Sequence, residues 1–248
     1  MLQRLFIFLL IFLILPDIYL YLRFIVHLTA KRWLRILYWL PAFLLSTGLL
    51  YLVYFSNNAF AERHTQAIGW VSLFFFLFTA PKLLLSLCTI IGVPFHKWLR
   101  WPRTPFICTG LTLAVISIVM IIYGSFIGRT QFDVKEVTYS SPKLPSAFDG
   151  YRIVQLSDIH IGSWQGNTSA IQKLVKLVNE QQADLIVFTG DLVNHRAVEL
   201  NDFQDILSGL KAKDGVYSIL GNHDYGPYFR WKSQQEQDDN LNDLLQRQ

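Results

Sequence analysis

Residues 152–160 read Arg-Ile-Val-Gln-Leu-Ser-Asp-Ile-His, a short apolar run that ends in an acidic residue and a histidine. An apolar run followed at once by polar side chains occurs twice more. It reads Leu-Ile-Val-Phe-Thr-Gly-Asp at 185–191 and Val-Tyr-Ser-Ile-Leu-Gly-Asn-His-Asp at 216–224. Apolar positions at helical spacing separate the three runs, so the predicted order is strand, helix, strand, helix, strand. This order favours a mainly parallel sheet, in which the carboxyl ends of the strands meet at one edge.

The elements around these strands follow from the same patterns. A helix is expected after the polar residues 167–169, and a second helix over the apolar stripe at 200, 203, 206, 207 and 210. Residues 132–140 alternate between apolar and polar side chains, which predicts a further strand.

The polar residues at the three strand ends are the candidates for a metal site. Carboxylate, imidazole and amide groups are the ligand mix that suits borderline divalent metals such as manganese, iron or zinc. Strand topology is expected to bring these residues to one rim: Asp158, His160, Asp191, Asn222, His223 and Asp224. His195 follows the second cluster by four residues and is interpreted as a surface or rim histidine.

The first half of the chain is different in kind. The protein is 52% hydrophobic and only 16% charged, and its apolar residues gather into four long runs at 5–22, 34–55, 67–93 and 107–127. A bilayer core about 30 Å thick needs about 20 apolar residues as a helix, so four membrane spans are predicted. Proline at position 81 leaves two alternatives for the third run, one bent helix or a span followed by a surface segment.

The charges of the connecting loops predict the orientation. Basic residues flank the first and third loops, whereas Glu62 and Arg63 cancel in the second. The positive-inside rule puts the first and third loops in the cytoplasm, so everything after Arg129 is expected outside the cytoplasm, on an integral protein of the inner or cell membrane. Two charges fall within spans, Asp17 and Lys82. Either they pair, because a charge in lipid needs a partner, or they snorkel or mark misjudged span ends.

The net charge of +4 and the placement of the basic residues beside apolar runs exclude a nucleic-acid footprint. The two cysteines, Cys88 and Cys108, lie in apolar runs and supply no disulfide framework for the C-terminal part.

The ordered series Asp-x-His, Gly-Asp and Gly-Asn-His-Asp, each after a strand, resembles the calcineurin-like metallophosphoesterases. The resemblance covers about residues 151–225 and points to the branch with N-terminal membrane helices. It implies four membrane helices over 1–128, a linker and first strand over 129–150, and the first half of an α/β metallophosphoesterase domain, an αββα sandwich, over 151–248.

The resemblance also implies roles for single residues and a cofactor of two divalent metal ions. Asp158 and His160 would bind the first metal, Asp191 would bridge both, and Asn222 would bind the second. His223 would contact phosphate and act as general acid, with Asp224 fixing its ring.

The family pattern continues into a Gly-His-x-His motif, but no histidine follows His223. The C-terminal part of the catalytic domain is therefore expected to be missing from this chain, and the chain to be weakly active. The function expected of it is metal-dependent hydrolysis of phosphomonoesters or diesters at the membrane, where anchorage favours a lipid-linked substrate. The alternative is a non-catalytic membrane or interaction protein that retains part of the metal site.

Overall fold

The structure is a computed structural model and describes residues 2–54 and 65–248. The chain divides into two compact units, Met1–Gln131 and Phe132–Gln248. Glu62 and Arg63, the two charged residues of the second loop, lie outside the described residues.

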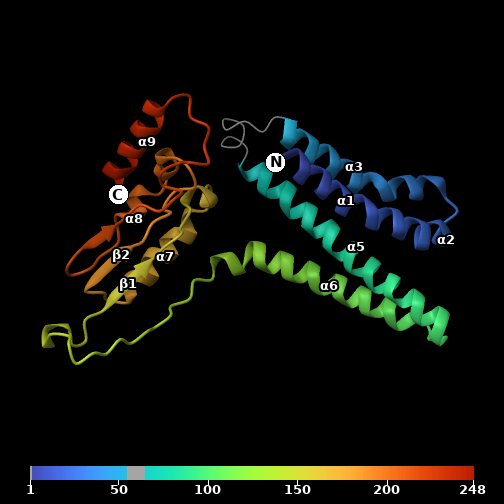
Figure 1. The fold of residues 1–248 in the computed structure, drawn as a ribbon, viewed down its shortest axis with the longest axis horizontal. Coiled ribbons are helices and arrows are strands. Elements are labelled where there is room, and N and C mark those ends of the chain that lie inside the picture. The colour runs from blue at the N-terminus through green and yellow to red at the C-terminus, as the bar shows by residue number, and fades with distance from the viewer. Residues whose placement is uncertain (1, 55–64) are drawn as a thin grey trace. The chain divides into compact units, whose positions relative to one another are not determined.

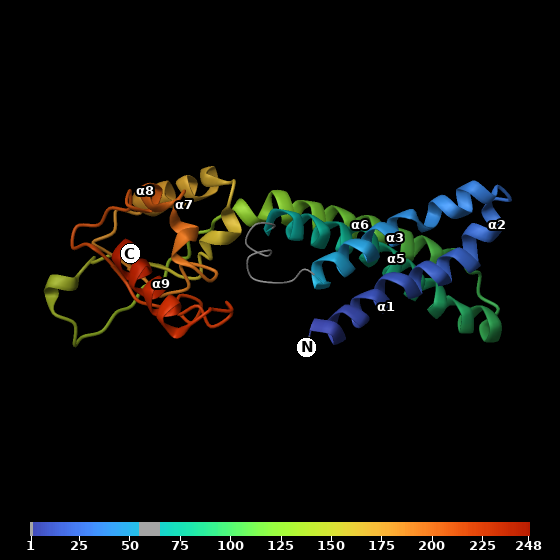
Figure 2. The same cartoon turned by 90° about the horizontal axis from the view of Figure 1, so that it is seen from above.

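The first unit consists of long apolar helices (Figures 1 and 2). They are α1 (Leu2–Leu20), α2 (Val26–Leu28), α3 (Arg32–Tyr54), α5 (Thr65–Leu99) and α6 (Thr104–Phe126), with a π-helical turn at Tyr21–Ile25 between α1 and α2. Among the described residues, four stretches are long and apolar enough to cross a membrane: Ile7–Leu28, Arg32–Leu52, Ala67–Leu99 and Thr104–Thr130. The four predicted spans are thus confirmed as four membrane-length helices.

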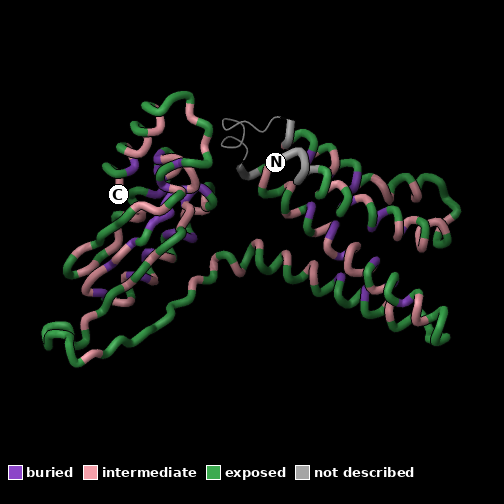
Figure 3. Tube along the Cα trace, in the orientation of Figure 1, coloured by how far each residue is buried: buried purple, intermediate pink, exposed green. Residues whose placement is uncertain are grey.

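The third span is one continuous helix despite its prolines. Pro81 and Pro94 both lie inside α5, which runs for 35 residues. Neighbouring helices and local adjustment can satisfy a carbonyl that proline leaves without its usual donor, which is why a proline does not end a membrane helix. Few residues along these helices are buried, as Figure 3 shows, because in a membrane their partners are lipid tails.

Asp17 and Lys82 form an ion pair between α1 and α5. The Lys82 Nζ lies 2.6 Å from the Asp17 Oδ1, and Asp17 is fully buried. The Tyr38 hydroxyl donates to the same carboxylate oxygen at 3.0 Å, and the Lys82 ammonium lies 5.6 Å from the centre of the Tyr38 ring. The predicted pairing is confirmed, and α3 joins it through Tyr38.

The second unit is built on a small parallel sheet. Its strands are β1 (Ile153–Leu156), β2 (Leu185–Phe188) and β3 (Val216–Ser218), in the order β1-β2-β3. Both pairings are parallel, with Leu156 opposite Phe188 and Phe188 opposite Ser218. The three strands predicted at 152–157, 185–189 and 216–220 and their parallel arrangement are therefore confirmed.

Helices cover one face of this sheet and fill the space beyond the strand ends. They are α7 (Thr168–Glu180), α8 (Gln204–Leu207) and α9 (Gln234–Arg247), with single 3-10 turns at Ser146–Phe148, Ile161–Trp164 and Ala197–Leu200. Val178 of α7 packs with Ala183 and Ile186 against the sheet. A second cluster gathers Phe203, Leu244 and the residues that follow β2, and it fixes the segments that carry the polar strand ends.

Two predicted elements differ from the structure. The stripe at 200–210 forms only a 3-10 turn and the single turn of α8, although Leu200 and Phe203 are buried as a stripe predicts. Residues 132–140 form no strand, because a strand needs a neighbour for its N–H and C=O groups and none of the described strands pairs with this segment.

Candidate metal centre

The polar residues after the three strands meet at one edge of the sheet, as the parallel order requires. Backbone bonds continue the strand pairing into the loops. The Asp158 N–H donates to the Gly190 carbonyl at 3.0 Å, and the His160 N–H donates to the Asp191 carbonyl at 3.0 Å. The segments after β1 and β2 thus stay side by side where their side chains turn towards each other.

The backbone of these segments is unusual. Asp158, His160 and Asp191 all have positive φ angles, of 54°, 47° and 60°. A left-handed conformation is uncommon for residues other than glycine, and such outliers gather at functional sites. Gly190, at φ 105°, precedes Asp191, and a side chain there would collide with the backbone of Gly221. This close approach lets short side chains from β2 and β3 reach a shared centre.

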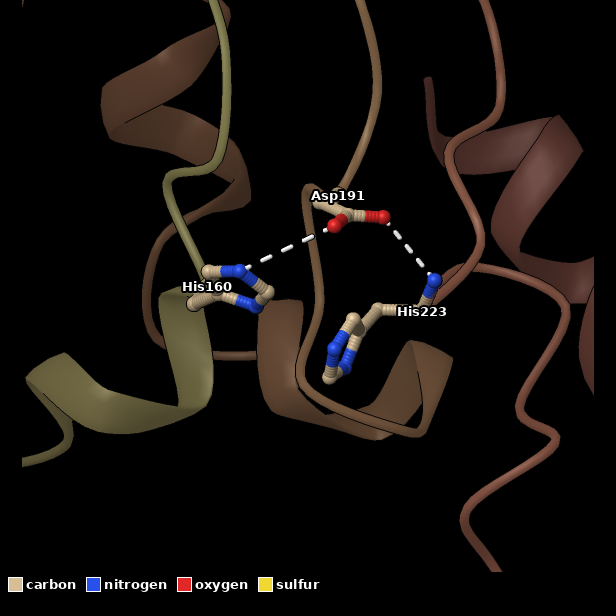
Figure 4. Close-up of side chains that lie close together, drawn as sticks. All are labelled: His160, Asp191 and His223. Atoms are coloured by element: carbon tan, nitrogen blue, oxygen red, sulfur yellow. Dashed lines mark hydrogen bonds and ion pairs between the residues drawn. The ribbon is translucent and has the colours of Figure 1, made fainter.

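Three side chains converge at that centre: His160, Asp191 and His223 (Figure 4). One ligand atom from each lies within 4.8 Å of the others. His160 Nε2 is 3.8 Å from Asp191 Oδ2, and the two imidazole rings meet edge to face with 4.6 Å between their centroids. Two imidazoles and a carboxylate suit a borderline divalent cation, so these residues fit a metal ion.

Asp191 lies in the middle of this group. It is buried, with 8% of its surface exposed, and its Oδ1 accepts the backbone N–H of His223 at 2.8 Å. The Oδ2 atom faces His160. One carboxylate thus touches residues that follow β1 and β3.

Asp158 and Asn222 lie next to this trio of side chains. The Asp158 carboxylate is 64% exposed, lies 3.9 Å from His160 Nε2 and hydrogen-bonds the Ser157 hydroxyl. The Asn222 amide nitrogen donates to the Tyr228 hydroxyl at 3.3 Å. Asp158 thus lies beside His160 and faces solvent, whereas Asn222, the sequence neighbour of His223, makes its side-chain contact with Tyr228.

Asp224 does not orient the His223 ring, which corrects one expectation. Its buried carboxylate accepts four backbone N–H groups at 2.8 to 3.1 Å, from Asp191, Leu192, Val193 and Gly221. Each carboxylate oxygen already has two donors, so none is left for an imidazole. Asp224 instead ties the loop after β2 to the loop after β3.

The group that orients His223 is a backbone carbonyl. His223 Nδ1 lies 2.8 Å from the Asn194 carbonyl oxygen. A carbonyl can only accept, so Nδ1 carries the proton of this bond and Nε2 is the nitrogen available for a metal or a substrate. Glu199 supports the same loop by accepting the Asn194 N–H at 2.7 Å. The His195 ring stacks near His223, with 6.0 Å between centroids, beside the trio.

Sequence reasoning missed Asn194, Glu199 and Tyr228. Asn194 acts through its backbone, which leaves no trace in residue type. Glu199 accepts three consecutive backbone N–H groups, from 194, 195 and 196, at 2.7 to 3.0 Å. An acidic residue after a polar run was its only sequence signal.

Two known protein families match this chain. Residues 3–129, which are 127 of the 248, match the family described as "Probable Calcineurin-like phosphoesterase, transmembrane domain", and residues 151–247 match "Calcineurin-like phosphoesterase". This chain belongs to the calcineurin-like phosphoesterases.

Several curated proteins are similar to this chain. A "Transmembrane protein with metallophosphoesterase domain" from Danio rerio is 36% identical over 111 residues, 45% of this chain and 25% of the relative. The uncharacterized metallophosphoesterase YkuE of Bacillus subtilis is 34% identical over 113 residues, 43% of this chain and 37% of the relative. The UDP-2,3-diacylglucosamine pyrophosphatase LpxG of Chlamydia muridarum is 31% identical over 130 residues, 50% of this chain and 39% of the relative.

This chain thus spans 25% to 39% of the length of these three relatives. No solved structure matches it significantly. The family uses divalent metals and acts on phosphoesters, and the four helices make this chain an integral membrane protein. The expected incompleteness of its catalytic domain stays a prediction.

Proposed function

We propose that this chain is a membrane-anchored hydrolase of phosphate esters whose site takes two divalent metal ions. The convergence of His160, Asp191 and His223 on one centre is the observation that supports this proposal. Asp158 and His160 would hold the first ion, Asp191 would bridge the two, and Asn222 would hold the second. When bound, the metal pair would supply Lewis acidity and a water of lowered pKa.

Asp191 is suited to a bridging position because both of its oxygens point along the rim. One faces His160 and the other lies on the His223 backbone, so its orientation is fixed before any ion arrives. A fixed carboxylate loses little freedom on binding, which favours affinity.

His223 is assigned to proton transfer. With Nδ1 held by the Asn194 carbonyl, Nε2 is its one nitrogen free for chemistry. In the imidazolium form, Nε2 would donate its proton to the leaving alkoxide, as a positioned general acid does.

The site is joined to the membrane helices by the segment from 130 to 150, so its substrates are expected close to a bilayer. The relative LpxG is named for hydrolysing a diacylated nucleotide sugar at a pyrophosphate. Both facts favour a lipid-linked phosphodiester or pyrophosphate. The charge of the loops favours a location outside the cytoplasm for the catalytic unit.

The proposal is tested on the full chain purified in detergent, by titration with Mn²⁺ in a calorimeter and by hydrolysis of an aryl phosphodiester. Asp191→Asn should abolish both metal binding and metal-dependent hydrolysis. The exposed Asp202, which lies apart from the trio in sequence and contacts, gives the matched control Asp202→Asn, which should behave as wild type.

Two further variants separate the roles of the histidines. His160→Gln should weaken Mn²⁺ binding, whereas His223→Gln should keep the affinity and lose hydrolysis. Wild-type protein that binds no divalent metal would overturn the proposal. Metal binding without hydrolysis of any phosphoester would favour the non-catalytic alternative.

A further inference from the structure

A tightly fixed loop follows the last cluster of the site. At Gly226, where φ is 65°, an added Cβ would lie 2.8 Å from the Trp231 ring and 3.1 Å from the His195 carbonyl. The Trp231 indole N–H donates to the Gly226 carbonyl at 2.8 Å, and the Trp231 and Phe229 rings pack with 4.5 Å between centroids. The loop 226–231 is therefore closed on itself and held against the segment that carries His195.

This loop places Tyr228 beside the site. The centroid of its ring lies 4.7 Å from that of His223, and its hydroxyl accepts the Asn222 amide N–H at 3.3 Å. Tyr228 is nevertheless 61% exposed, so a solute can reach it. Its phenol thus stands in contact with two site residues and with solvent.

The hydrogen-bonding capacity of this phenol is only partly used. A tyrosine hydroxyl accepts hydrogen bonds and donates one. Its acceptor side meets Asn222, and among the described residues its own proton has no acceptor. Because Asn222 directs its nitrogen to Tyr228, its Oδ1 is the end left for a cation. An unused O–H beside His160, Asp191 and His223 suits an anionic oxygen.

We propose that Tyr228 is a substrate-positioning residue: its hydroxyl donates a hydrogen bond to a non-bridging oxygen of the phosphate group held at the centre formed by His160, Asp191 and His223. This inference rests on the proposed function. It adds to that function a contact which none of the three polar clusters predicts.

The test is Tyr228→Phe in the full chain loaded with Mn²⁺ in detergent, with inorganic phosphate as the probe. Losing one hydrogen bond to a charged group should weaken phosphate binding about tenfold or more. KM for the aryl phosphodiester should rise by a similar factor, with a smaller change in kcat. Mn²⁺ affinity should change little, because the bond to Asn222 is long.

Tyr225→Phe is the matched control. Tyr225 is also exposed and lies three residues earlier, and its backbone carbonyl accepts the Gln237 side chain. This variant should bind phosphate as wild type does. Unchanged phosphate affinity and KM in Tyr228→Phe, in a protein whose wild type binds Mn²⁺ and phosphate, would overturn the inference and leave the proposed function standing. A wild-type protein that binds neither Mn²⁺ nor phosphate would overturn both the inference and the proposed function.

Discussion

Asp224→Asn is the substitution for which the structure gives the sharpest expectation. The carboxylate has zero exposed surface and accepts four backbone N–H groups, two on each oxygen. An asparagine amide has one oxygen and one NH₂ group. In either orientation it keeps two acceptor bonds, loses two, and turns its own N–H groups towards two backbone donors.

The magnitude follows from this count. A hydrogen bond to a charged group contributes about 1.5–3 kcal/mol, so the loss of two should cost about 3–6 kcal/mol. The free energy of unfolding of a domain is only about 5–15 kcal/mol, so the loops after β2 and β3 should open far more often. A fall of about 3 kcal/mol in the free energy of local opening raises the rate of amide exchange about a hundredfold.

The assay is amide hydrogen exchange followed by mass spectrometry on the full chain in detergent. Peptides over 190–194 and 221–224 should lose protection, while peptides from α5 and α6 should exchange as in wild type. Asp202→Asn is the control, because Asp202 is exposed. If Asp224→Asn keeps wild-type protection at 190–194, the four-bond anchor is wrong.

Three other predictions concern the rest of the chain. Asp17→Asn and Lys82→Gln should each lower the free energy of unfolding by about 3–5 kcal/mol, because each leaves the other charge without its partner. In thermal unfolding the double variant should lose less than the sum of the two single losses, and additive losses would reject the pair. The hydrogen bond to Asp214, aided by burial and by the charge itself, raises the pKa of Tyr151 to about 12, so this contact stabilises the fold below about pH 10 and is lost as the pH rises through 12. Asp214→Asn should return one tyrosine to an ordinary pKa in a spectrophotometric titration, and an unaltered titration would contradict the contact. Alkaline phosphatase fused after Gln248 should be active in a bacterial host if the catalytic unit lies outside the cytoplasm, and an inactive, stably made fusion would reverse the topology.

Much of the fold could be predicted because it depends on repeated patterns. Apolar runs of membrane length predicted four helices, and three short runs with helical spacing between them predicted the parallel sheet. The strand at 132–140 failed because alternation describes the two faces of a strand and says nothing of a hydrogen-bonding neighbour. The helix at 200–210 failed because burial of Leu200 and Phe203 is satisfied by turns as well as by a helix.

Only part of the site could likewise be predicted from the sequence. That His160 and Asp191 meet follows from parallel strand order alone. The role of Asp224 does not, because the family resemblance implied that its carboxylate fixes the His223 ring, and only the folded loops show four N–H groups converging on it. The true partner of His223 is the Asn194 carbonyl, and every residue has a carbonyl.

Hydrogen bonds between the loop after β2 and the loop after β3 explain why the residues of the third motif are consecutive in the sequence. Asp191 accepts the His223 N–H with its side chain, while its own N–H donates to the Asp224 carboxylate. The two loops are therefore bound in both directions, and the same carboxylate accepts the Gly221 N–H and closes the turn around Asn222. An inserted residue anywhere between Gly221 and Asp224 would break at least one of these bonds. The motif Gly-Asn-His-Asp is thus a structural unit, since its glycine and aspartate hold the loop that carries Asn222 and His223.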